Sequence, residues 1–201
     1  GMENVSMLVY DDPGLFQEMI DTLVELTVTC HRRVLEMGAR YDACSFWEDM
    51  CYNAGPLLSP GDFKRFMLPG YQRITEQLRG YGCDVCWVDC DGRIDELLPL
   101  WLEGGVNCMF PIEAGTSGGD PVRFRQQYGK DLLMMGGFDK HILAKSTDDI
   151  DREIDRLTPV VEEGGYIPFA DHRVPPDVPL NNYLHYIHRA RAVWGHGRNL
   201  K

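Results

Sequence analysis

The stretch Val85-Cys86-Trp87-Val88-Asp89-Cys90-Asp91-Gly92 decides the fold, because it joins a buried strand to two carboxylates and a glycine. Strand side chains alternate between faces, so Trp87, Asp89 and Asp91 share one face, and the other face is apolar and suits packing under helices. Burying two carboxylates is costly unless a cation, a hydrogen-bond donor or a shared proton compensates. Asp89 and Asp91 are therefore the first candidates for a functional site, at the strand end where α/β proteins place their chemistry.

Strands and helices alternate on both sides of this stretch. Hydrophobic periodicity and capping residues predict helices over residues 12–38, 59–79 (with a break or kink at Pro69-Gly70), 94–102, 120–128, 146–163 and 182–194. Further strands are expected over residues 41–47, 106–112, 132–135 and 166–170. Residues 1–11 are expected to form an irregular N-terminal arm, residues 12–195 a single β/α domain, and residues 196–201 a polar C-terminal tail.

The alternation of strands and helices predicts parallel β/α units with right-handed crossovers. A closed barrel usually needs about 250 residues, and this chain has 201. We therefore expect either an open α/β sheet or a partial, shortened TIM-type (β/α) barrel. A partial barrel leaves two strand edges and an apolar interior exposed, so the chain is expected to pair with another chain or a second copy, with a homodimer as the expected assembly.

Composition narrows the class of protein. The formal net charge of −11 disfavours nucleic acid and anionic membranes as partners, since both need basic patches. The chain has seven cysteines, an odd number that cannot all pair in disulfides, and most fall inside predicted helices or strands. This indicates reduced thiols in a cytoplasmic protein. The first twenty residues include Glu3 and Asp11 and no basic n-region, so no signal peptide is expected. No apolar run is long enough to span a bilayer.

Each predicted strand ends in polar residues: Glu48-Asp49, Asp89 with Asp91, Glu113, Asp139, and Asp171-His172. Parallel strands would bring all of them to one face. A single acid at such a place is more often a helix cap or a solvated loop residue. The convergence of Asp89, Asp91 and His172, with Asp49 nearby, suits a site for zinc or another divalent ion, and it equally suits a metal-free acid–base pair.

Several stretches together resemble the uroporphyrinogen decarboxylase superfamily, which includes corrinoid-dependent methyltransferases. They are Gly55-Pro56-Leu57-Leu58-Ser59-Pro60 with Phe63, Phe66 and Pro69, Asp91-Gly92 with Ile94, Gly136-Gly137-Phe138-Asp139, and Asp171-His172-Arg173-Val174-Pro175-Pro176-Asp177-Val178-Pro179 with Asn182. The resemblance covers nearly the whole chain from Asp12 and implies a TIM-barrel relative, matched over its C-terminal half or more. The family's N-terminal strands, which in decarboxylases carry an arginine-rich stretch and an essential aspartate, have no counterpart here.

The resemblance also implies a site. In the methyltransferase branch a zinc ion is held by a His-x-Cys pair at the strand matching Asp89-Cys90-Asp91 and by a later cysteine matching His172. The chain would thus offer Asp89, Asp91 and His172 as metal ligands. Such a metal site has harder ligands than the cysteine-containing site of the methyltransferases and is less suited to activating a thiol. In the decarboxylase branch the position of His172 is also a histidine, and it contacts the tetrapyrrole.

The sequence favours metal-assisted methyl transfer with a corrinoid protein as partner. The catalytic candidates are Asp49, Glu48, Asp89 and His172, and the substrate-binding candidates are Trp47, Arg93, Glu113, Phe138, Asp139 and Arg173. One alternative is decarboxylation of a porphyrinogen, which is a lyase reaction. Against it, the expected site at the strand ends is mostly acidic, and Arg93 and Arg173 are its only obvious cations. The other alternative is a truncated, non-catalytic paralogue that acts as a dimer or a partner subunit.

Overall fold

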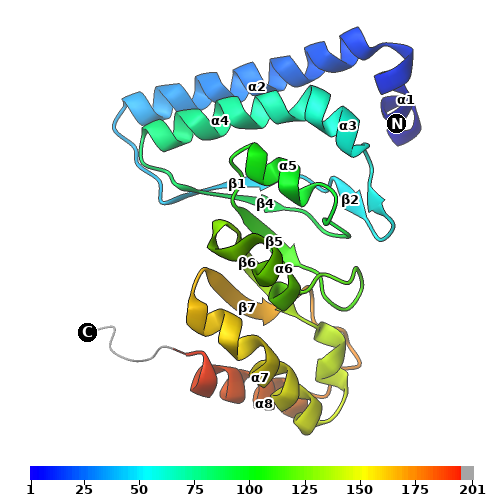
Figure 1. Ribbon diagram of the computed structural model, residues 1–201, viewed down its shortest axis with the longest axis vertical. Helices are drawn as coiled ribbons and strands as arrows, with labels where there is room; N and C mark the ends of the chain where they lie inside the picture. Colours follow the sequence, from blue (N-terminus) through cyan, green and yellow to red (C-terminus); the bar gives the residue numbers. More distant parts are fainter. Residues whose placement is uncertain (196–201) are drawn as a thin grey trace. The chain divides into compact units, whose positions relative to one another are not determined.

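The computed structural model describes residues 1–195, which fall into two compact units (Figure 1). The first unit is Gly1–Cys108, and the second begins at Met109. The first unit contains α1 (Met2–Asp11), α2 (Pro13–Glu36), β1 (Ala43–Trp47), β2 (Cys51–Tyr52), β3 (Gly55–Pro56), α3 (Pro60–Asp62), the π-helical segment η1 (Phe63–Met67), α4 (Leu68–Gly80), β4 (Val85–Asp89) and α5 (Leu98–Glu103). Strand β5 (Cys108–Ile112) begins where the two units meet in the sequence.

The second unit continues the alternation of helices and strands. Its elements are α6 (Pro121–Tyr128), the 3-10 turns η2 (Gly129–Asp131) and η3 (Lys140–Ala144), β6 (Leu133–Phe138), α7 (Thr147–Glu163), β7 (Tyr166–Ala170) and α8 (Leu180–Val193). The five-strand sheet has the order β1-β4-β5-β6-β7, so β1 and β7 are its edge strands. This arrangement of parallel strands and helices confirms the expected α/β fold of a partial TIM-type barrel.

In the first unit, helices cover one face of a parallel strand pair. The register of β1 and β4 runs from Ala43 beside Val85 to Trp47 beside Asp89. Helix α2 packs along α4, and the two run side by side in Figure 1. On the helix side, alternate strand residues are buried, as Phe46 and Val88 are, or half-buried, as Cys44 is. The opposite face of the pair therefore carries the partly exposed side chains.

The N-terminal residues are helical, so the expectation of an irregular arm was wrong. Helix α1 packs against α2, and Val9 is buried at 6% exposure. The two helices meet at Asp12, whose backbone N–H donates to the carbonyl of Leu8 and whose side chain accepts from the N–H of Leu15. Burial of an apolar residue on α1 stabilises a segment that is too short to be helical alone.

The chain stays helical at Pro69-Gly70, so of the break or kink expected there, the break does not occur. The chain continues from α3 through the π-helical segment Phe63–Met67 into α4, and the N–H of Leu68 donates to the carbonyl of Phe63. Pro69 lies in the first turn of α4, where the missing N–H of a proline is tolerated. The wider π-helical turn before Pro69 thus lets the chain remain helical past the proline.

In the second unit, β6 is longer than the sequence predicts. It continues through Gly136 and Gly137, which have φ angles of 94° and 78°, to Phe138. Its parallel register with β7 runs from Met134 beside Tyr166 to Phe138 beside Ala170. Helix α7 begins with the expected capping box of Ser146 and Asp149, and it packs against β7 and α8. Across residues 1–195, no helix is both long and apolar enough to cross a bilayer.

Candidate active site at the strand ends

Backbone and side-chain hydrogen bonds join the ends of β1 and β4. The N–H of Glu48 donates to the carbonyl of Asp89 at 2.9 Å. The N–H of Asp91 donates to Oδ1 of Asp49 at 3.2 Å, although both chain segments are acidic. Asp49 is exposed, and Asp89 and Asp91 are half-buried. The structure therefore brings Asp49, Asp89 and Asp91 to one edge of the first unit, as the sequence predicts.

An aromatic and acidic face lies beside these acids. Trp47 is next to Asp89 in the register of β1 and β4, and Ser45 is next to Trp87. Strand alternation places Trp47, Trp87 and Asp89 on the face turned away from the helices, since Val88 between the last two is buried under them. Trp47 is 83% exposed. We call Trp47, Trp87, Asp49, Asp89 and Asp91 the acidic aromatic face.

Glu48 points to the opposite side of the sheet, toward α4. The hydroxyl of Tyr71 donates a short hydrogen bond to its carboxylate, and the Tyr71 ring stacks on Phe63 and tilts against Phe46. Burial raises the pKa of Glu48 to about 7. This position supports an anchoring role between sheet and helix, and the catalytic role expected for Glu48 stays a prediction.

A two-stranded hairpin, β2 and β3, packs against the segment after β4. The thiols of Cys51 and Cys90 are buried and share a hydrogen bond, which lowers the pKa of Cys90 and raises that of Cys51. All seven cysteines are free thiols. Gly92 has a φ angle of 87°, and a Cβ there would lie 2.9 Å from backbone atoms of Tyr52. Sequence reasoning missed this hairpin and the thiol pair, because neither short strand has a recognisable period.

In the second unit, Asp171 organises the ends of three strands. Its side chain is completely buried and accepts hydrogen bonds from the N–H groups of Ala114 at 2.8 Å, Gly115 at 3.0 Å and Lys140 at 3.1 Å. Those donors begin the loops after β5 and β6, and Asp171 itself follows β7. A carboxylate with these partners holds the loops together, which is a structural role.

Lys140 is a buried cation that sequence reasoning missed. Its Nζ lies 3.5 Å from Oε1 of Glu113 and 3.7 Å from Oδ1 of Asp171, and Ser117 donates to the other oxygen of Glu113 at 3.0 Å. Both Lys140 and Glu113 are 8% exposed. The sequence does contain a signal for it, because Lys140 directly follows Asp139 at the end of a predicted strand. The charge of Lys140 is largely compensated by two carboxylates.

The remaining predicted residues of the second unit have different surroundings. Phe138 is fully buried against the ring of Tyr186, with centroids 4.6 Å apart, which favours a packing role. Asp139 caps η3 and accepts from the N–H of His141 at 2.9 Å. His172 and Arg173 are exposed in the loop after β7, and Arg93 is exposed after β4 in the first unit.

A metal site needs several donor side chains close together. Within residues 1–195, no group of three or more His, Cys, Asp or Glu side chains is positioned to hold one. Asp49 already accepts a backbone hydrogen bond through one of its oxygens. The ligand set of Asp89, Asp91 and His172, whose members belong to different units, stays a prediction, and we derive no reaction step through a metal.

Comparisons with known proteins give a consistent family assignment. The chain matches the uroporphyrinogen decarboxylase (URO-D) family over residues 1–193. It is 24% identical over 185 residues to the uroporphyrinogen decarboxylase of Syntrophotalea carbinolica, covering 87% of this chain and 48% of that protein. It is also 24% identical over 201 residues to the uroporphyrinogen decarboxylase of Streptomyces avermitilis, covering 94% of this chain and 51% of that protein. The chain thus spans about half the length of these curated relatives.

A solved structure shares the fold. A methyltransferase from Methanosarcina mazei superposes with a TM-score of 0.67 at 16% sequence identity, covering 96% of this chain and 53% of that one. At this level of identity the likeness concerns the fold alone. The match again leaves about half of the larger protein without a counterpart in this chain.

Proposed function

Because the chain belongs to the uroporphyrinogen decarboxylase family, we propose that it acts in the family's methyl-transfer chemistry and binds a small methylated ammonium cation as methyl donor. The observation that carries this proposal is the acidic aromatic face, where Trp47 lies beside Asp89 and Ser45 beside Trp87. Indole rings attract quaternary ammonium groups through their electron-rich faces, and this attraction strengthens when water is excluded. Nearby carboxylates add a favourable Coulombic contribution.

The charges at the strand ends support a cationic substrate over a polyanionic one. Asp49, Asp89 and Asp91 gather at the rim of the first unit. In the second unit, Lys140 is already paired with Glu113 and Asp171. A porphyrinogen carries several carboxylates that need cationic partners. The residues at these strand ends therefore suit a porphyrinogen less well than they suit a cationic substrate. The net charge of −11 also favours the approach of cations.

The chemistry assigns a simple role to the residues of this face. Methyl transfer from an ammonium group breaks a C–N bond, and the electron pair of that bond stays on the departing neutral amine. A corrinoid on a partner protein would supply the methyl acceptor. Trp47, Trp87 and Asp89 would bind the cation and orient its methyl group away from the sheet. Because they hold the charged donor more tightly than the neutral amine, they would also favour product release.

Calorimetric titration of the full chain with tetramethylammonium chloride tests this proposal. We expect saturable binding, with Trp47→Leu and Asp89→Asn each weakening it about fivefold, which corresponds to a loss of roughly 1 kcal/mol per contact. Tyr52→Leu is the matched control, because Tyr52 is an exposed aromatic residue of the hairpin outside the face. It should bind as the wild type does.

Titration with two further compounds distinguishes methyl transfer, porphyrinogen decarboxylation and a non-catalytic role. The neutral isostere tert-butanol should bind far more weakly than tetramethylammonium, and equal binding would remove the cation hypothesis. Tight binding of uroporphyrin together with no binding of tetramethylammonium would favour porphyrinogen decarboxylation. If neither ligand binds, the non-catalytic paralogue becomes the better hypothesis.

A further inference from the structure

We propose that the exposed face of α2 pairs with the same face of a second copy of this chain, with the two helices antiparallel. Unlike a homodimer formed through open strand edges, this pair forms through a helix. It concerns assembly and does not depend on which ligand the acidic aromatic face binds. Three observations carry it, namely the spacing of apolar residues along α2, their exposure, and the order of charges along the helix.

One face of α2 is already packed inside the first unit. Val28 and Leu35 are buried, and the side chain of Val24 lies against Gly70 of α4. The carbonyl of Val28 also accepts a hydrogen bond from the side chain of Gln77 at 3.0 Å. Val24, Val28 and Leu35 follow one another at helical spacing, so they share one side of α2. Figure 1 shows α4 running along α2, which accounts for the burial of this side.

Another face of α2 is apolar and open to solvent. It carries an exposed cysteine and large apolar side chains that are between 41% and 87% exposed. We call this face the α2 stripe; its members are Leu15, Met19, Leu23, Leu26, Cys30, Val34 and Met37. They follow one another at alternating steps of three or four residues, the spacing at which one helix packs lengthwise on another. A contiguous apolar surface of this kind marks an interaction site.

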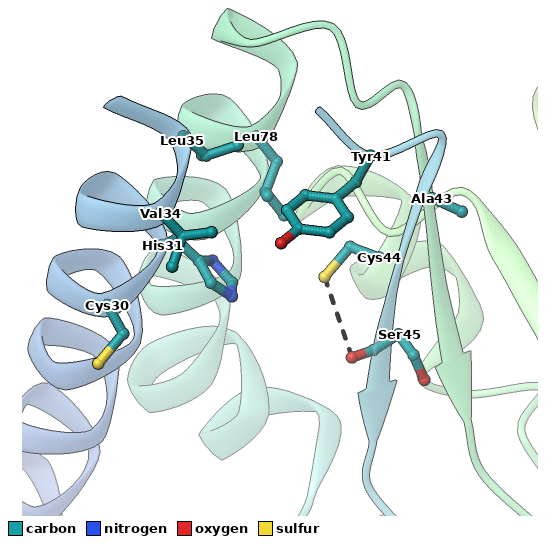
Figure 2. Close-up of a pocket in the computed structure, with 9 residues that line it drawn as sticks. All are labelled: Cys30, His31, Val34, Leu35, Tyr41, Ala43, Cys44, Ser45 and Leu78. Atoms are coloured by element: carbon teal, nitrogen blue, oxygen red, sulfur yellow. Dashed lines mark hydrogen bonds between the residues drawn. The ribbon is translucent and has the colours of Figure 1, made fainter. Parts of the chain in front are cut away.

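The side chain of Cys30 shows how the stripe differs from its surroundings. In Figure 2, His31 points from α2 toward Tyr41 and Cys44, whereas Cys30 is directed away from them. The two consecutive residues therefore belong to different faces of the helix. His31 belongs to the face toward the sheet, and Cys30 belongs to the α2 stripe.

The order of charges along α2 favours an antiparallel copy as the partner. Glu18 and Asp21 lie toward the start of the helix, Arg32 and Arg33 lie toward its end, and all four are exposed. In an antiparallel pair centred on Leu26, the acids of one copy lie near the arginines of the other and attract them. A parallel pair would instead bring like charges together. Of the other acids in α2, Glu25 is paired with Arg73 and Glu36 lies in the last turn.

The α2 stripe is self-complementary in this arrangement. Leu26 meets Leu26 at the twofold axis, Leu23 meets Cys30, Met19 meets Val34 and Leu15 meets Met37. A helix of 24 residues is about 36 Å long, and pairing along it would bury on the order of 1,000 Å² in total, the lower end for specific interfaces. We therefore expect a reversible dimer. Repulsion between copies that each carry a net charge of −11 is screened beyond about 8 Å at physiological salt.

Sedimentation velocity of the full chain over a range of concentrations tests the proposal. We expect a monomer–dimer equilibrium with a dissociation constant on the order of 10 μM. Leu23→Glu should raise this constant about tenfold or more, because it places carboxylates in an apolar interface. Leu180→Glu is the matched control, because Leu180 is 69% exposed on α8 and the change in charge is the same. A chain that stays monomeric up to about 500 μM, or equal dimerisation by Leu23→Glu and wild type, would overturn the proposal.

A pair of charge reversals tests the antiparallel order. Glu18→Arg alone and Arg33→Glu alone each bring like charges together across the interface, so each should weaken the dimer about fivefold. The double variant restores opposite charges and should dimerise as the wild type does. A double variant that is weaker than either single variant would contradict antiparallel pairing.

Cross-linking locates the twofold axis. In a Cys30→Ser background, which removes the exposed cysteine of α2, a short bismaleimide should join Leu26→Cys to its counterpart, because both lie at the axis. Met19→Cys should not be joined, because it lies about 10 Å from the axis along each helix. Equal cross-linking at both positions would show parallel pairing, and cross-linking at neither would place the interface elsewhere; either result overturns the proposal.

Discussion

Asp171 and Asp49 both follow strands, yet their side chains have opposite surroundings. Asp171 is completely buried and accepts three backbone N–H groups, while Asp49 is exposed and accepts one. Glu48, next to Asp49, points to the helices and is held by Tyr71. At the residue scale, therefore, an acid at a strand end can be a structural anchor or part of a binding face, and only its partners distinguish the two.

The raised pKa of Glu48 predicts how stability depends on pH. Its pKa is about 7 in the folded protein against 4.5 ordinarily, so the folded state binds more protons between these pH values. The free energy of unfolding should thus fall as pH rises from 4.5 to 7, by at most about 3 kcal/mol. Urea unfolding should show that Glu48→Gln, which stays neutral, is more stable than the wild type at pH 8 but not at pH 5. An equal difference at both pH values would contradict this account.

At the element scale, two irregular pieces shape the first unit. The π-helical segment Phe63–Met67 carries the helix past Pro69, and the hairpin of β2 and β3 packs on the turn after β4. The turn works only because Gly92 adopts a positive φ and lies close to the backbone of Tyr52. The position of Asp91, and with it the acidic aromatic face, depends on this turn.

Replacement of Gly92 should therefore be costly. Gly92→Ala must strain the backbone and push a Cβ against Tyr52, so we expect a loss of about 1–3 kcal/mol in the free energy of unfolding. Gly80→Ala is the control, because Gly80 ends α4 with ordinary φ and open space around it. It should be neutral or slightly stabilising. Chemical denaturation of both variants checks this, and similar losses for both would contradict the role given to Gly92.

At the scale of the whole molecule, the high negative net charge affects the stability of the fold. A net charge of −11 destabilises a compact chain through self-repulsion, and dissolved salt screens this repulsion. Raising NaCl from about 20 mM to about 500 mM should increase the free energy of unfolding by on the order of 1 kcal/mol. KCl should act equally if screening is the cause. Stability that is unchanged or lower at high salt would show that ion pairs such as Arg156 with Glu153 outweigh the repulsion.

Periodicity and capping were enough to predict most of the fold. Residues such as Ser146 and Asp120 act within one turn of the chain, so the starts of α7 and α6 follow from local sequence alone. The alternation of apolar strands and amphipathic helices likewise determines the parallel α/β class. The helix α1 was missed because its stability comes from packing against α2 and not from its own sequence.

For the candidate site, too, some features follow from the sequence and others only from the tertiary structure. The sequence by itself determined which acids end the strands, because that depends only on strand length and order. Tertiary structure alone decided that Trp47 lies beside Asp89, that Glu48 turns to Tyr71 and that Lys140 is buried between Glu113 and Asp171. These contacts join residues far apart in the chain, and their energies depend on burial and distance, which a sequence pattern does not encode.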